Sequence, residues 1–284
     1  MVKQAACFFT GGYTESGALT GFLEKINQQV HFKQLCPNRP RGRKRPRAET
    51  DLKDEVSGLT GPALLDYVYH YLDKYPRDLA DCDAVIIEDD LDGRFTELAV
   101  PGDEKTRVSR KTQAFRDHCQ TVISEVQKRL GKDASFPVVL LFAAPEIEAW
   151  LLSDWEHTFG YVYGPKGTAV LTADENRFFS SRFRPYVRDI VLQDYANEVE
   201  NYGYFSGEYK KLSDQLVSAL QSFQIELGKP EEASSHARAI AFKRELRYSK
   251  MLHGDAMLRQ LSPDEVRKKC TVYFEEAFSQ IKVL

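Results

Sequence analysis

The first half of the chain alternates short apolar runs with stretches that repeat apolar residues at helical spacing. The apolar runs that predict strands cover residues 5–10, 30–36, 84–87 and 137–142. The stretches with helical spacing cover residues 14–27, 62–75, 111–130 and a segment that begins at Pro145 and carries Glu146, Glu148 and Trp150. Strands that alternate with helices in this way predict an α/β fold, with a mainly parallel sheet covered by helices on both faces.

Strand signals fade beyond about residue 155. Apolar residues at helical spacing, divided by turns that contain glycine or proline, predict helices over residues 188–197, 206–227, 234–248 and 263–281. We therefore predict two units, an α/β domain over residues 1–155 and a mostly helical C-terminal lobe over residues 156–284.

A basic segment interrupts the predicted α/β domain. Residues 37–59 lack hydrophobic periodicity, which predicts a long surface loop. Nine consecutive residues of this segment, 39–47, include six cationic side chains: Arg39, Arg41, Arg43, Lys44, Arg45 and Arg47. Because the formal net charge of the chain is -3, this positive charge is local. Such a run can neutralise nucleic-acid phosphates, with solvation or protein binding as the alternative.

Several classes of protein are not expected. The longest apolar stretch, residues 138–144, is far shorter than the ~20 residues that cross a bilayer, so we expect no membrane partner. The five cysteines are scattered without a CxxC pair, which indicates a reduced, cytoplasmic protein without structural zinc. Gly11-Gly12 before a helix is the one candidate phosphate loop, but no nucleotide-binding glycine motif is present, so ATP hydrolysis is not expected.

Carboxylates follow two of the predicted strands, where functional groups gather in open α/β sheets. Glu15 follows the first strand, and acids at 88–92 end the third. If the chain stays extended, Glu88, Asp90 and Asp92 point to one side while the residues between them point elsewhere. Clustered carboxylates suit Mg²⁺ or Mn²⁺. The alternative is that these acids, like those at 146 and 148, are solvated or lie at helix N-termini.

Lys250 and His253 fall in a predicted turn between two helices. Either side chain can contact a phosphate or stabilise a leaving group. Capping of a neighbouring helix is an equal alternative for each.

Thr14-Glu15 after a glycine-ended strand, together with Glu88-x-Asp90-x-Asp92, resembles the Toprim pattern of one glutamate and an Asp-x-Asp pair. Two segments, residues 145–154 and the stretch from 248–250 to 269–274, are similar to a bacterial Toprim-like family related to RloB and to nucleases of the overcoming-lysogenization-defect type. The resemblance implies a Toprim-like fold with Glu15 as metal ligand or general base. It implies metal ligation by Asp90 with Asp92 or Glu88, and a ligand or supporting role for Glu148. Glu88 stands where the family more often has aspartate, so the ligand pair stays open.

These observations lead to the hypothesis of a metal-dependent endonuclease that cleaves DNA or RNA with Mg²⁺ or Mn²⁺. Its candidate catalytic residues are Glu15, Asp90, Asp92 and Lys250, and its candidate metal ligands are Glu15, Glu88, Asp90, Asp92 and Glu148. The resemblance implies prokaryotic anti-phage defence beside a separate ATPase subunit. A catalytically inactive scaffold and a hydrolase of small phosphorylated molecules are the alternatives, and a homo-oligomer is left open.

Overall fold

The fold is seen in a computed structural model, which describes residues 2–10, 13–37, 58–92, 94–95, 111–167, 171–187, 199–201, 204–205, 208–209, 211–228, 234–241 and 247–284. Within these ranges, the description leaves out the side chains of residues 13–16, 201, 204–205, 208–209 and 250–251. The basic run, Gly11-Gly12 and the predicted helix over 188–197 lie outside the described residues. In this part of the chain, no helix is both long enough and apolar enough to span a membrane.

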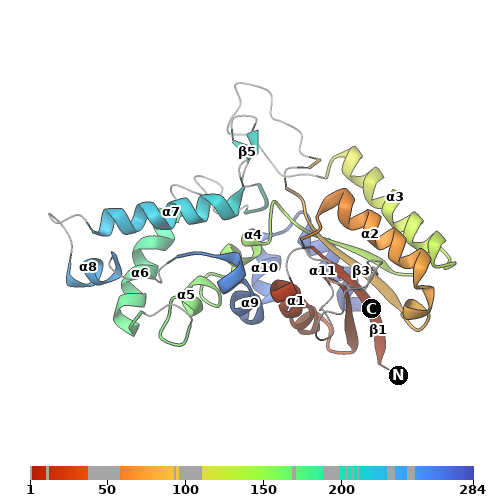
Figure 1. Cartoon of the computed structure of the whole chain (residues 1–284), viewed down its shortest axis with the longest axis horizontal. Helices are drawn as coiled ribbons and strands as arrows, with labels where there is room; N and C mark the ends of the chain where they lie inside the picture. The colour runs from red at the N-terminus through yellow and green to blue at the C-terminus, as the bar shows by residue number, and fades with distance from the viewer. Residues whose placement is uncertain are drawn as a thin grey trace, which may run out of the picture.

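A four-stranded, all-parallel sheet forms the centre of the α/β part and confirms the predicted fold class (Figure 1). Its strands, in the spatial order β2-β1-β3-β4, are β2 (Val30–Cys36), β1 (Lys3–Phe9), β3 (Ala84–Asp90) and β4 (Val138–Ala143). Phe9 of β1 pairs with Glu88 of β3, and Asp90 pairs with Ala143 of β4. The acidic end of β3 is therefore flanked by a strand on each side.

Alternation along the strands gives the sheet two apolar faces, as expected of a parallel sheet buried on both sides. One face, with Ala6, Phe8, Val85 and Ile87, packs against α2 (Gly61–Lys74) and α3 (Gln113–Arg129). A 3-10 turn, η1 (Pro76–Leu79), follows α2. The other face packs against α1 (Tyr13–Ile26) and α4 (Glu148–Ser153), and also against C-terminal helices.

The last three helices return to the sheet. They are α9 (Lys250–Gln260), α10 (Pro263–Lys269) and α11 (Phe274–Val283). α9 packs along α1, and α11 packs on β4. The indole of Trp150 in α4 stacks on Phe22 of α1 at 5.6 Å and meets Phe274 of α11 edge-on at 5.2 Å. Aromatic contacts thus join helices that are far apart in sequence into one hydrophobic cluster.

Helices between α4 and α9 lie farther from the sheet, at the left of Figure 1. They are α5 (Phe159–Val162), α6 (Ala173–Tyr186), α7 (Leu212–Leu227) and α8 (Ser235–Ala241). A 3-10 turn, η4 (Val199–Asn201), and a two-stranded hairpin of β5 (Tyr204–Phe205) and β6 (Glu208–Tyr209) precede α7. The C-terminal half is helical, as predicted, and the boundary at residue 155 stays a prediction.

Three predicted C-terminal helices are wrong in their bounds. The helix predicted from 206 begins at Leu212, because β6 occupies the residues before it. The helix predicted over 234–248 does not reach its predicted end, because residues 247 and 248 are not helical. The helix predicted over 263–281 is two helices, α10 and α11, separated at residues 270–273. Helix α6, with a Thr172 capping box, was not predicted.

Candidate functional site

The acids of β3 lie inside the strand and are buried at its carboxyl end. β3 continues through Asp90, three residues beyond the apolar run that predicts it. Glu88, Asp89 and Asp90 are all nearly inaccessible to solvent. Because side chains alternate along a strand, Glu88 and Asp90 share the face of Ile86, on which α1 and α4 pack, and Asp89 has the opposite face. The prediction that Glu88 and Asp90 point to one face of the strand, away from Asp89, is confirmed.

Glu88 is held against the end of β1. The backbone N–H of Thr10 donates to Glu88 Oε2 at 3.0 Å and to the Glu88 carbonyl at 3.1 Å. Helix α1 begins three residues after Thr10, and Glu15 belongs to its first turn. The backbone of Glu15 therefore lies near the end of β1, as predicted, while its side chain is outside the description.

Asp90 is held against the chain that follows β4. The backbone N–H of Ile147 donates to Asp90 Oδ1 at 3.0 Å, directly before α4 begins at Glu148. The backbone N–H of Leu91 donates to the carbonyl of Ala143 at 2.8 Å, which extends this pairing by one residue. Asp90 thus fixes the start of α4 to the central strand, and a carboxylate at a helix start is favourably placed.

The prediction that Asp92 shares a face with Glu88 and Asp90 by strand alternation is wrong. β3 ends at Asp90, and Asp92 has a left-handed backbone with φ of 47°. Its N–H donates to the carbonyl of Pro145 at 2.9 Å. The chain has left the extended conformation, so a period of two no longer places this side chain.

Asp89, on the opposite face of the strand, bonds to the start of α2 and to Arg94. Its carboxylate accepts the N–H of Gly61, the first residue of α2, at 2.9 Å and forms an ion pair with Arg94. Gly61 has φ of +54°, a conformation that glycine adopts readily. Burial raises the pKa of Asp89, and the Arg94 guanidinium and the Gly61 N–H oppose that rise. Asp89 therefore has a structural role, and neither it nor Arg94 was among the predicted site residues.

The two glutamates after β4 have different partners. Glu146 reaches the start of α7, where it accepts the N–H of Leu212 at 3.0 Å and the hydroxyl of Ser213 at 2.8 Å. Glu146 therefore lies at a helix N-terminus, which was the alternative to a metal-binding role, but the helix is α7 and not the one that follows β4. Glu148 is fully buried and accepts a hydrogen bond from Tyr248 Oη at 2.8 Å. Its backbone directly follows Ile147, whose N–H is bonded to Asp90.

The predicted turn around Lys250 and His253 is wrong, because Lys250 is the first residue of α9 and His253 lies within that helix. The His253 ring is buried, and its Nδ1 accepts the N–H of Ser249 at 3.2 Å, which is the helix-capping alternative. Lys25 at the end of α1 donates to the carbonyl of Leu261 at 2.8 Å, just past the end of α9. Since α9 packs along α1, both helices run in the same direction, and their first turns lie at the same end.

The flanks of the basic segment lie at this same end of the sheet. Pro37 directly follows β2, and its carbonyl accepts the side-chain amide of Gln34 at 2.6 Å. On the other flank, Thr10 Oγ1 donates to the carbonyl of Leu59 at 2.7 Å. The segment that carries the six cations therefore leaves the fold at the same edge of the sheet as the acids, at the end of β2. It rejoins the fold at Leu59, which is bonded to Thr10 next to Glu88.

The donor chemistry of the site suits a hard cation, but its described part is incomplete. In the residues that the structure describes, no three Asp, Glu, His or Cys side chains converge closely enough to hold a metal ion. Magnesium, however, is commonly bound by only one or two protein carboxylates together with water and substrate oxygens. Glu88 and Asp90, on one face of β3, meet that smaller requirement.

Sequence reasoning missed the partners that hold these acids. Thr10, Ile147 and Tyr248 contact carboxylates 78, 57 and 100 residues away along the chain. No local pattern reveals such pairs, although Tyr248 lies in a segment that the family resemblance includes. Two features of the sequence could have indicated Thr10 and Ile147 as partners of the acids: Thr10 ends the first predicted strand, and Ile147 lies at the start of the helix predicted after the fourth.

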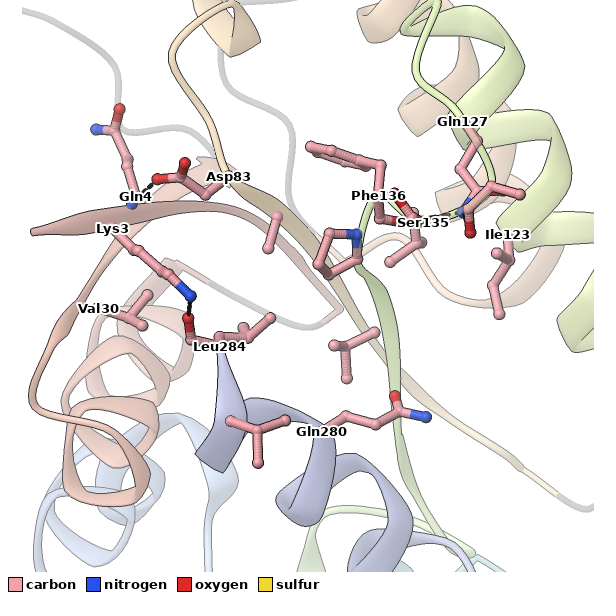
Figure 2. A pocket seen from close by; sticks show the side chains of 16 residues that line it. Lys3, Gln4, Val30, Asp83, Ile123, Gln127, Ser135, Phe136, Gln280 and Leu284 are labelled. Carbon is pink, nitrogen blue, oxygen red and sulfur yellow. Dashed lines mark hydrogen bonds between the residues drawn. The ribbon is translucent and has the colours of Figure 1, made fainter.

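A cavity of about 390 Å³ lies at the opposite edge of the sheet (Figure 2). It is lined by residues at the starts of the strands, such as Lys3, Val30 and Asp83, and by Gln127 of α3 and Gln280 of α11. The polar groups of Gln4 and Asp83 bond one another there, at 2.8 Å between Gln4 N and Asp83 Oδ2. This cavity is separate from the acids, which lie at the carboxyl ends of the strands.

No family model matches the chain, and comparisons with curated proteins and with solved structures found no similar protein.

Proposed function

We propose that this protein is a metal-dependent phosphodiesterase, an endonuclease that cleaves DNA or RNA with Mg²⁺ or Mn²⁺. One observation carries the proposal: Glu88 and Asp90 are buried side by side on one face of the central strand, at the carboxyl end where α/β proteins bind ligands. Burial of two acids this close is costly unless hydrogen bonds or a cation compensate them.

Glu88 and Asp90 would hold the metal ion, and Glu148, whose carboxylate does not converge with theirs on one metal position, would support the site. A bound divalent ion lowers the pKa of a water molecule and stabilises charge on phosphodiester oxygens. Thr10 N and Ile147 N would orient the two carboxylates through the bonds described above. Glu15 and Lys250 begin helices at this end of the molecule and are proposed as general base and phosphate contact.

Nucleic acid is the proposed substrate because of the basic segment. Its flank at Pro37 lies at the same edge of the sheet as the acids, and its flank at Leu59 is bonded to Thr10, next to Glu88. Six cations on a segment tethered there would attract a polyanion toward the proposed site. The resemblance to Toprim-like nucleases supports the same assignment, with a role in prokaryotic defence beside an ATPase subunit.

The test is cleavage of labelled single- and double-stranded DNA and RNA with Mg²⁺ or Mn²⁺. We compare the native chain with Glu88→Gln and Asp90→Asn, which remove charge but keep an oxygen to accept the bonds from Thr10 and Ile147. Loss of a metal contact worth about 3 kcal/mol corresponds to a roughly 100-fold lower rate. We expect at least that loss from either variant, with the thermal unfolding midpoint retained.

Asp83→Asn is the matched control, because Asp83 precedes the same strand at its other end and is exposed. It should cut at the native rate. Cleavage that persists in Glu88→Gln and Asp90→Asn would place the site elsewhere, and no cleavage by the native chain with any substrate or metal would contradict the nuclease proposal.

A second candidate is a non-catalytic scaffold or regulatory subunit of a defence complex. It is favoured by the structural bonds that Asp89, Asp90 and Glu146 make to backbone N–H groups at the starts of α2, α4 and α7. Such bonds give these acids a role in folding without a metal. Under this alternative, Asp90→Asn changes stability, and the chain neither binds Mn²⁺ nor cuts nucleic acid.

A further inference from the structure

The cavity at the starts of the strands has the size and the lining of a small-molecule site (Figure 2). Its volume of about 390 Å³ is within the range of roughly 300–1,000 Å³ that ligand pockets occupy. Apolar side chains form much of its wall, among them Val30, Ile123, Phe136, Val138 and Val139. A mainly apolar ligand would remove this surface from water, which favours binding.

The part of the wall between α3 and β4 is a loop that hydrogen bonds already fix. Gln127 Nε2 of α3 donates to the carbonyl of Phe136 at 2.9 Å and to that of Ala134 at 3.2 Å. Asp133 Oδ1 accepts the N–H of Ser135 at 2.8 Å. Because these bonds hold the loop against α3, a ligand would enter a wall that is already formed, which lowers the entropic cost of binding.

The same glutamine presents a hydrogen-bond acceptor to the cavity. The side chain of Gln127 is only 9% exposed. Its two partners are carbonyls, so the amide nitrogen must face them and Oε1 lies at the other side of the amide group. Within the described part of the chain, no donor is bonded to this oxygen. A ligand N–H or O–H is therefore the partner that Gln127 lacks.

The charges at the cavity favour a neutral ligand. Among the described residues that line it, Lys3 and Asp83 are the charged ones, and both are exposed. Their charges are opposite, and each is bonded to a backbone group: Lys3 Nζ donates to the carbonyl of Leu284, and Asp83 Oδ2 accepts the N–H of Gln4 at 2.8 Å. An ion would lose its hydration in this cavity without an excess of opposite charge to compensate it.

We propose that this cavity binds a small, neutral, mainly apolar molecule that carries a hydrogen-bond donor, and that the donor bonds to Gln127 Oε1. Ile123 and Phe136 would contact the apolar body of the ligand. The cavity lies at the edge of the sheet opposite the acids, so this site does not depend on the proposed nuclease activity.

Two probes of nearly the same shape test the proposal on the full chain. Indole has an N–H donor, and benzofuran has an oxygen in its place. Methyl NMR spectra recorded during each titration report binding, with Ile123 as the signal at the cavity and Ile240, buried in α8, as the distant control. We expect indole to shift the Ile123 signal with a Kd of about 1 mM or below. Benzofuran should bind at least about fivefold more weakly, because it leaves the Gln127 oxygen without a donor.

A cavity-filling variant locates the binding independently. Ala134 is exposed and lines the cavity, so Ala134→Phe adds a ring at its wall without replacing a buried side chain. It should weaken indole binding by about tenfold or more. Ala114→Phe is the matched control, because Ala114 is exposed in the first turn of α3 and does not line the cavity. This variant should bind indole as the native chain does.

Three results would overturn the inference. The native chain could fail to bind indole at millimolar concentration, which would exclude the site. Equal affinity for indole and benzofuran would exclude the bond to Gln127, and this comparison uses the native chain alone, so it stands even if Ala134→Phe does not fold. Indole binding that persists in a folded Ala134→Phe variant would place the ligand elsewhere. None of these results bears on metal binding or nucleic-acid cleavage at the acids.

Discussion

Three consecutive carboxylates in β3 have three different environments. Glu88 bonds to the end of β1, Asp90 to the start of α4, and Asp89 to the start of α2 and to Arg94. Alternation along a strand predicts which of them share a face, because it depends only on local geometry. Their partners come from distant segments, which local pattern does not reveal.

Asp92 shows the limit of the same reasoning. The alternation rule holds only while the backbone is extended, and the backbone turns at this residue. Nothing in Leu91-Asp92-Gly93 excludes a longer strand except the glycine, which can also lie within a strand end. The sequence therefore predicts correctly that Glu88 and Asp90 share a face of the strand, and it extends that pattern one residue too far, to Asp92.

His253 gives a prediction about pH at the residue scale. Burial lowers the pKa of His253, and the nearby Arg247 lowers it further. The Nδ1 atom accepts the N–H of Ser249, so the folded state requires the neutral ring. Because the folded pKa lies below the unfolded value of about 6.5, this contribution to stability is complete above that pH and is lost as pH falls below it.

We therefore expect the free energy of unfolding to decrease between about pH 6.5 and 5, measured by urea titration at several pH values. His253→Asn, whose side-chain oxygen can accept the same N–H, should flatten this part of the curve. His31→Asn, on an exposed position of β2, should leave the slope as in the native chain. An unchanged slope in His253→Asn would show that other groups produce the pH dependence.

At the element scale, the positions of strands and helices in the α/β part follow from periodicity, and the ends of the C-terminal helices do not. The break between α10 and α11 is an example. The carboxylate of Glu200 accepts the N–H groups of Val272, Tyr273 and Phe274 at the start of α11. That acid lies 74 residues before Phe274, so the apolar spacing of residues 263–281 gives no sign of the break.

Helix α7 gives a prediction at this scale. Glu146 supplies bonds to the first two residues of α7, although the helix lies 66 residues farther along the chain. Glu146→Ala should lower the free energy of unfolding by about 1–3 kcal/mol, because a buried N–H and hydroxyl lose a charged acceptor. Chemical denaturation measures this change.

Glu226→Ala is the control on the same helix, since Glu226 is exposed near the opposite end of α7. Its effect should stay within about 0.5 kcal/mol. Equal losses from both substitutions would show that helix propensity, and not the bond across the fold, determines the effect.

At the scale of the whole molecule, the two edges of the sheet differ in chemistry. The starts of the strands, with α3 and α11, line a cavity that has apolar, amide and charged side chains, Lys3 and Asp83 among them. The ends of the strands carry the buried acids and the flanks of the basic segment. Nucleic acid bound to the basic segment would therefore meet the acidic edge.

Replacement of the six cations by serine, with segment length preserved, tests this arrangement. If all six contact duplex phosphates, the slope of log K against log salt should become less negative by up to about 5, and binding should weaken. Fluorescence anisotropy over a salt series measures both quantities. Lys128→Ser with Lys268→Ser, which removes exposed cations from α3 and α10, should change neither. An unchanged slope in the six-site variant would show that the basic segment does not contact nucleic-acid phosphates.

The return of α9 and α11 to the sheet has a consequence for synthesis on the ribosome. Asn27, at the end of α1, donates to the carbonyl of Ile281 at 3.0 Å, and Phe22 packs near Phe274. Until α9 and α11 have been synthesised, they cannot cover the parts of α1 and β4 on which they pack. Late, long-range contacts of this kind slow folding and prolong exposure of apolar surface. We therefore expect a ribosome-bound chain of this protein to bind chaperones that recognise exposed hydrophobic segments.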